Sequence, residues 1–213
     1  MTSTVTQMLR AVAAGLKIPT IIILLLLIAL TVVLLGTLVA EYFTERKQLK
    51  GSIPQLIDEM QGKNTEELGE VIRSSGLLQR QKDAVLEVVS RGSLPEDTRI
   101  ALAKKLLLDE EKHYLGRVRV SDLIAKVAPM FGLMGTLIPL APGLIALGQG
   151  DTKTLSDSLL IAFDTTVAGL ISAAVSLLIS SVRKSWYAGY SSSLEAVMEA
   201  VLDVTGGDGN EDE

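Results

Sequence analysis

The apolar stretch 158–182 carries one acidic residue, Asp164, among hydroxyl and glycine residues. An ionised carboxylate in the middle of a bilayer costs at least ~2.5 kcal/mol even on insertion scales, so it should be protonated, paired or in contact with water. Two interpretations of Asp164 stay open at this point. It is either a group that binds and releases protons or a structural acid satisfied by hydrogen bonds.

Small and hydroxyl-bearing residues recur every three or four positions along the same stretch, which places them on one helical face. Such a face is typical of close helix packing, and it also suits a polar path, because a helix that meets only lipid has no need of hydroxyls. The face comprises Ser158, Ala162, Thr165, Gly169, Ser172 and Ser176, with Thr166 beside it. With Asp164, the hydroxyl residues Ser158, Thr165, Thr166 and Ser172 are candidates for an ion path.

The preceding apolar stretch, 127–150, adds Thr136 to the candidate ion path. Each proline in a helix removes an amide donor and frees the carbonyl four residues earlier, which is tolerated best beside water, an ion or a neighbouring helix; a simple kink is the alternative. The residues assigned to helix packing or kinking are Gly132, Gly135, Pro139, Pro142 and Gly143, together with Gly169 of the next stretch.

Other chemistry is disfavoured by the composition. The chain has one histidine, His113, and no cysteine, so no second His or Cys is available to complete a metal site. A Ser–His–acid triad is also disfavoured, because His113 lies in a charged segment expected in the cytoplasm, far in sequence from Asp164. The turn 148–154 resembles a phosphate-binding loop, but Thr152 occupies the position before the lysine and an apolar span precedes the turn. We therefore expect no enzyme activity, no cofactor and no metal. The net charge of −5 gives no indication of nucleic-acid binding.

Three apolar stretches exceed the roughly 20 residues needed to cross a bilayer. Residues 18–40 and 127–150 contain no charged residue, and 158–182 contains only Asp164. The first stretch is longer than the apolar region of a signal peptide and has no small-residue cleavage site before Glu41, so we interpret it as a retained anchor.

Basic residues predict the orientation of these spans. Segment 41–126 holds 15 Lys and Arg, and Arg183 and Lys184 follow the third span, whereas only Arg10, Lys17 and Lys153 lie elsewhere. The positive-inside rule then places the N-terminus outside and both segment 41–126 and the C-terminus in the cytoplasm.

Helices are expected throughout the cytoplasmic segments. Asn64 and Glu67 have the spacing of a capping box, and no helix breaker occurs between Pro95 and Pro129, so a helix can continue from the cytosol into the second span. After the third span, Tyr187 to Val201 carries an amphipathic stripe. A monomer of this size would expose that stripe, so we expect oligomerisation to bury it.

Two motifs in the second and third spans resemble the paired signature of the MotA/TolQ/ExbB proton-channel family. They are Ala128-Pro-Met-Phe-Gly-Leu-Met-Gly-Thr-Leu-Ile and Ile161-Ala-Phe-Asp-Thr-Thr-Val-Ala-Gly-Leu-Ile-Ser-Ala-Ala. The resemblance implies a pentameric inner-membrane channel that holds a dimeric, single-span partner of the ExbD/TolR/MotB type in its pore. It also implies that Thr136 and Thr166 line that pore.

The sequence therefore predicts an all-α integral membrane protein whose second and third spans extend into a helical cytoplasmic domain, assembled as a pentameric ring in the inner membrane. Its function would be to conduct ions, most simply protons, as a subunit of a motor that moves the single-span partner; a non-conducting membrane scaffold is the alternative. The expected segments are an external or interfacial amphipathic stretch 1–17, spans 18–40, 127–150 and 158–182, a cytoplasmic domain 41–126, an external turn 151–157, a cytoplasmic helix 183–204 and a disordered acidic tail 205–213.

Overall fold

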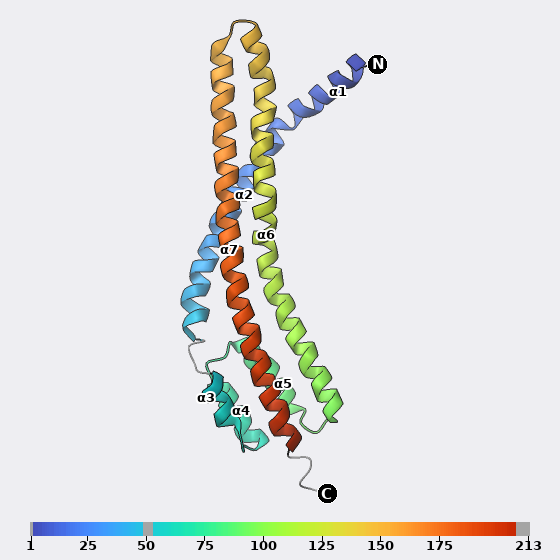
Figure 1. The fold of residues 1–213 in the computed structure, drawn as a ribbon, viewed down its shortest axis with the longest axis vertical. Helices are drawn as coiled ribbons and strands as arrows, with labels where there is room; N and C mark the ends of the chain where they lie inside the picture. Colours follow the sequence, from blue (N-terminus) through green and yellow to red (C-terminus); the bar gives the residue numbers. More distant parts are fainter. Residues whose placement is uncertain (1, 49–52, 208–213) are drawn as a thin grey trace. The chain divides into compact units, whose positions relative to one another are not determined.

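The computed structural model describes residues 2–48 and 53–207, and the regular structure in these ranges is helical (Figure 1). This confirms the all-α fold expected from the sequence. The helices are α1 (Thr2–Gly15), α2 (Lys17–Gln48), α3 (Ile53–Met60), α4 (Thr65–Ser74), α5 (Gln79–Ser90), α6 (Glu96–Gly148) and α7 (Thr152–Gly207).

Three of these helices, α2, α6 and α7, contain stretches long and apolar enough to cross a membrane. They include the three spans expected from the sequence, so a membrane protein with three apolar helices is confirmed. Helix α6 continues through Pro129, Pro139 and Pro142 without ending. Of the predicted acidic tail, residues 205–207 are the last residues of α7, and residues 208–213 lie outside the described residues.

The turn between α6 and α7 is short because two residues close it. Gly150 adopts a φ of 83°, a left-handed conformation that glycine reaches without steric cost. Asp151 then accepts hydrogen bonds from the backbone N–H of Thr154 at 3.0 Å and from the Thr154 hydroxyl at 2.5 Å. The hydroxyl bond is the main reason that the pKa of Asp151 is lowered, and the resulting carboxylate caps the start of α7.

The start of α4 follows the capping signal in the sequence. The Asn64 side chain accepts a hydrogen bond from the backbone N–H of Thr65 at 2.6 Å. This satisfies one of the amide donors that a helix leaves unpaired at its first turn. The helix expected to begin at Asn64 is therefore confirmed.

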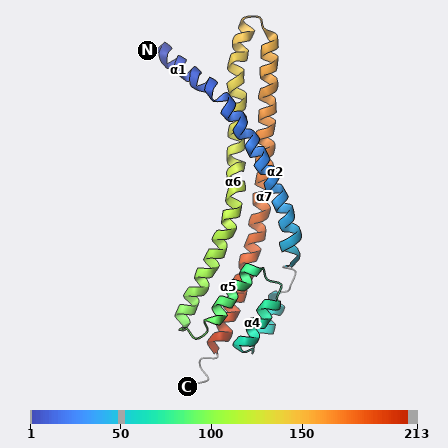
Figure 2. The same cartoon turned by 180° about the vertical axis from the view of Figure 1, so that it is seen from behind.

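The chain forms two compact units. The first comprises residues 1–37 and 119–181, and the second comprises residues 38–118 and 182–213. In the first unit, α6 and α7 run side by side, and α2 lies on one face of the pair: it passes behind them in Figure 1 and in front of them in Figure 2. Both views therefore leave the opposite face of the α6–α7 pair uncovered by described residues.

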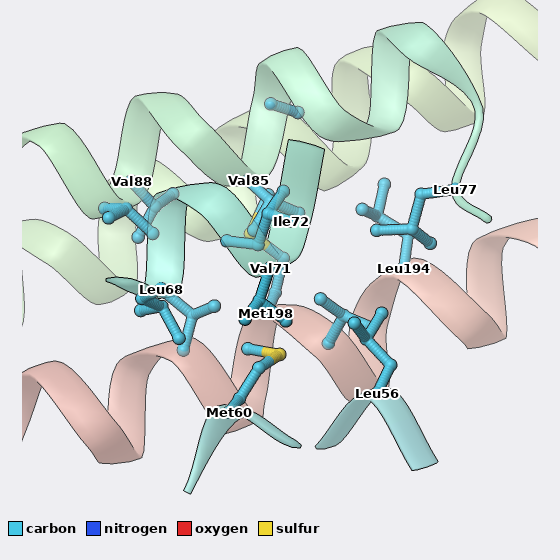
Figure 3. Close-up of a cluster of buried hydrophobic side chains, with 14 of the residues drawn as sticks. Leu56, Met60, Leu68, Val71, Ile72, Leu77, Val85, Val88, Leu194 and Met198 are labelled. Atoms are coloured by element: carbon cyan, nitrogen blue, oxygen red, sulfur yellow. The ribbon is translucent and has the colours of Figure 1, made fainter. Parts of the chain in front are cut away.

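The second unit has a core built from α3, α4 and α5 packed on α6 and α7 (Figure 3). Met60, Leu68 and Ile72 are fully buried there, and Leu194 and Met198 of α7 are only 1% exposed. The α7 stripe from Tyr187 to Val201 is thus buried inside one protomer. The expectation that oligomerisation would be needed to bury it is wrong. The short helices α3 to α5 cover Leu194 to Val201, and Tyr114 and Val118 of α6 pack against Tyr187 and Tyr190.

Candidate ion path and a charged helix junction

Glycines set the separation of α6 and α7 in the first unit. A Cβ atom on Gly169 would lie 2.8 Å from the carbonyl oxygen of Ala128 and 2.9 Å from the Cα of Gly132. A Cβ on Gly135 would lie 2.6 Å from the Cβ of Thr165, which is below any normal contact. The two helices therefore touch backbone to backbone, as small residues permit in membranes.

We expect Gly169→Ala to destabilise the α6–α7 pair by about 1–3 kcal/mol, the usual cost of adding a methyl group to a filled interface. The obstructing atoms are backbone atoms, which side-chain rotation cannot move away. Thermal unfolding of the detergent-extracted protein measures the effect. Gly116→Ala is the control, because a Cβ on Gly116 meets no atom within 4 Å; equal melting temperatures for both variants would contradict the packing argument.

Three of the candidate ion-path hydroxyls lie in this tight interface. Ser158, Thr165 and Ser172 are buried, and each donates to a carbonyl of its own helix, four residues earlier, at 2.8, 2.9 and 2.8 Å respectively. Their donors are thus satisfied within α7. In one protomer, these residues pack the helix pair together; their predicted place in an ion path remains a prediction.

Thr136 and Thr166 are half-buried at the edge of the same interface. Ile138 of α6 and Ile161 of α7 line a small cavity together with Ile21 of α2. The side of the helix pair that carries these two isoleucines is therefore the side that α2 covers. Ile138 follows Thr136 by two residues, a separation of about 160° around α6, and Ile161 precedes Thr166 by five, about 140° around α7. Both threonines therefore lie on the face that α2 does not cover.

The threonine hydroxyls on this face keep acceptor capacity. Thr136 donates to the carbonyl of Leu133 at 2.7 Å, and Thr166 donates to that of Ala162 at 3.1 Å. A hydroxyl carries one donor and two acceptor lone pairs, so each oxygen can still accept a hydrogen bond from another molecule.

Asp164 lies apart from these threonines. Asp164 precedes Thr166 by two positions, so the two side chains point about 160° apart around α7. Asp164 shares its flank with Ile161, three residues earlier, and it is exposed in the isolated protomer. Because a carboxylate at this depth is costly in lipid, its exposure favours contact with another chain or with water in the assembled protein.

A charged junction that the sequence motifs did not reveal lies in the second unit. The Glu41 carboxylate accepts hydrogen bonds from the Tyr187 hydroxyl at 2.5 Å and from Arg183 Nε at 3.1 Å, and Arg117 Nη1 lies 3.7 Å from it. The Glu41 and Arg183 side chains are only 6% and 5% exposed. Burial, then the hydrogen bond to Glu41, raises the pKa of the Tyr187 hydroxyl, so it remains a donor.

The sequence contained a signal for this junction. Glu41 directly follows the first predicted span, and Arg183 directly follows the third. Under the predicted topology both ends lie at the same membrane surface, so opposite charges there can pair. Counting basic residues orients the spans but does not identify the acid that each one pairs with.

A second inter-helix contact joins α6 and α7 near the end of the first unit: the buried Ser180 hydroxyl donates to the carboxylate of Asp122. Within the described residues, no group of three or more His, Cys, Asp or Glu side chains is placed to hold a metal ion.

Three long apolar helices, two of them in close contact through glycines, define a polytopic membrane protein. Residues 67–196 match the model of the MotA/TolQ/ExbB proton channel family, which is more than half of the chain. The chain therefore belongs to that family, and the resemblance of the two motifs is confirmed. The chain is also 35% identical over 122 residues to Motility protein A of Borreliella burgdorferi. That alignment covers 50% of this chain and 44% of the relative, so the chain spans less than half the length of the relative it matches.

Proposed function

We propose that the protein is the ion-conducting subunit of an inner-membrane motor that converts ion-motive force, most simply a proton gradient, into movement of a partner. The observation that carries the proposal is that α2 leaves uncovered the face with Thr136 and Thr166. The family to which the chain belongs is named for proton channels, which supports the same function. A ring of five copies would turn these faces toward a common pore. No residue is assigned a catalytic role, and the proposal requires no cofactor or metal.

The proposed partner is a dimer of an ExbD/TolR/MotB-like protein with one membrane span. The threonine oxygens would accept hydrogen bonds from a protonated acid of that span or from hydrated protons, and so pass protons along the pore. Ser158, Thr165 and Ser172 would support the path by holding α7 against α6. Asp164 would face a neighbouring copy in the ring, where it could exchange protons without contacting lipid.

Reconstitution tests the proposal directly. Liposomes containing the chain and its single-span partner should dissipate a pH gradient, and native mass spectrometry of the detergent-extracted complex should give five copies of this chain. A five-copy assembly with no flux under any ion gradient would favour a non-conducting scaffold, since close packing of hydroxyls is equally suited to assembly. A monomer or dimer would overturn the proposed ring.

The proposed orientation makes a separate prediction. The N-terminus and the turn 151–157 should lie outside, and segment 41–126 and the C-terminus should lie in the cytoplasm. Because the chain has no cysteine of its own, Ser90→Cys and Ser156→Cys each introduce one exposed thiol. A membrane-impermeant maleimide applied to intact cells should label Ser156→Cys only, and labelling of Ser90→Cys in its place would reverse the topology.

A further inference from the structure

A small cavity of about 10 Å³ lies in the first unit, where the start of α2 meets α6 and α7. Its walls include Lys17 and Thr20 of α2, Gly135 and Pro139 of α6, and Ile161 of α7. Thr20 is only 2% exposed, and Gly135 and Pro139 are buried as well, so the cavity reaches into the interior of the helix contact. We call it the proline cavity.

Pro139 leaves a carbonyl group without its usual helical partner at this cavity. A proline has no backbone N–H, so the carbonyl of Gly135, four residues earlier, receives no hydrogen bond from residue 139. Helical carbonyls point along the axis toward the residue four positions later, and here both Gly135 and Pro139 line the cavity. An interior carbonyl that stays unpaired costs about as much free energy as a lost hydrogen bond, so a donor is expected beside it.

The polar side chains of α2 add a second acceptor and a donor to the walls of the cavity. The Thr20 hydroxyl already donates to the carbonyl of Leu16 at 2.7 Å, so its oxygen can only accept a further hydrogen bond. Lys17, the first residue of α2, carries an ammonium group that can only donate. Among the described residues, no side chain donates to the Gly135 carbonyl. A molecule in the cavity therefore meets two acceptor oxygens and one donor group.

The size of the cavity and its polar groups favour water over an ion. A buried water needs roughly 10–15 Å³ of open space and about two to four polar partners, and the cavity offers both. A cation would be repelled by the ammonium of Lys17, and an anion would face the two acceptor oxygens. Water alone among these can donate to both oxygens and also accept from the lysine.

We propose that the proline cavity binds one water molecule, which donates to the Gly135 carbonyl and the Thr20 oxygen and accepts from the Lys17 ammonium. The water joins the start of α2 to the proline-containing part of α6. It also hydrates the flank of α7 that carries Asp164, one helical turn after Ile161, because helical side chains lean back toward the start of their helix. The site goes beyond the proposed function, which assigns no ligand to α2, and it does not depend on ion conduction.

Radiolytic labelling of the full chain in native-membrane nanodiscs tests the water site. An X-ray pulse converts a bound water into a hydroxyl radical, which oxidises the side chains around it even where bulk water does not reach. Mass spectrometry should find Ile138 and Pro139 oxidised. Thr20→Val keeps the shape of the side chain but removes the accepting oxygen, so it should lower this oxidation severalfold. Absent oxidation of both residues, or equal oxidation in the variant, would overturn the proposal.

A pair of proline variants tests the carbonyl separately. Pro139→Ala supplies the missing amide, so the Gly135 carbonyl can bond within α6 and the oxidation of Ile138 should fall. Pro142→Ala is the matched control, because it restores an amide in the same helix but Pro142 does not line the cavity. Equal oxidation of Ile138 in these two variants would contradict the assigned partner.

The outcome for the water site is separate from the outcome for ion conduction. Normal flux in a protein whose Ile138 and Pro139 are not oxidised would sink the water site alone. Clear oxidation that Thr20→Val removes, in a protein that conducts no ions, would support the water site and count against the proposed function.

Discussion

Thr136→Val/Thr166→Val should assemble normally and lose most of its ion flux. Valine keeps the shape of threonine and removes the hydroxyl, so the half-buried packing of both positions is preserved. A hydrogen bond to a charged group contributes about 1.5–3 kcal/mol. Each 1.4 kcal/mol changes a rate roughly tenfold, so we expect flux at least ~10-fold lower. Proton flux into liposomes that contain the chain and its partner, under a fixed pH gradient, is the measurement.

The control is Thr37→Val, which removes an exposed hydroxyl that donates to Leu34 in α2. Its flux should equal that of the unmodified protein. Asp164→Asn belongs in the same assay, because asparagine keeps the size of the side chain but cannot titrate. Lost flux with normal assembly would place Asp164 in the ion path, whereas unchanged flux would remove it. Unchanged flux in the threonine double variant would overturn the pore assignment.

Glu41→Gln should destabilise the protein far more than the loss of an exposed ion pair does. It would leave the Arg183 guanidinium buried without its countercharge, and breaking a buried ion pair costs about 3–5 kcal/mol. The loss should lower the temperature at which the detergent-extracted protein unfolds. Because Tyr187 also donates to Glu41, its packing on Tyr114, with ring centroids 4.6 Å apart, should loosen as well and change the near-ultraviolet circular dichroism.

Glu87→Gln is the matched control for this substitution. Glu87 pairs with Arg91 at 3.0 Å, but their side chains are 41% and 53% exposed. An exposed pair contributes only about 0–1 kcal/mol, so the melting temperature should change little. If Glu41→Gln unfolded at the same temperature as Glu87→Gln, the junction would not stabilise the protein.

Local signals in the sequence were sufficient for the helices. The apolar stretches are long enough to cross a bilayer, and the Asn64 cap forms the bond that its position predicts. The long α6 follows from the absence of breakers before Pro129, and the later prolines fail to end it. Within a membrane a helix is retained because unpaired backbone groups have no water to bind.

Contacts between distant segments could not be predicted in the same way. The stripe from Tyr187 to Val201 correctly indicated a buried surface, but periodicity does not say what covers it. The structure shows that α3 to α5 of the same protomer cover Leu194 to Val201, and that α6 covers Tyr187 and Tyr190. Likewise, helical spacing placed Thr165 and Gly169 on one face without revealing that Gly132 and Gly135 meet them. Whether hydroxyls line a pore or fill an interface depends on neighbours that spacing alone does not specify.

The internal bonding of the α7 hydroxyls also bears on how the protein enters the membrane. Ser158, Thr165 and Ser172 are satisfied by their own helix before it meets any partner. The short capped turn keeps α6 and α7 next to each other as they leave the ribosome. The helix pair can thus be inserted as a hairpin before any hydrogen bond forms between the two helices. The final packing of α6 on α7 then depends on how closely their backbones can approach at the glycines.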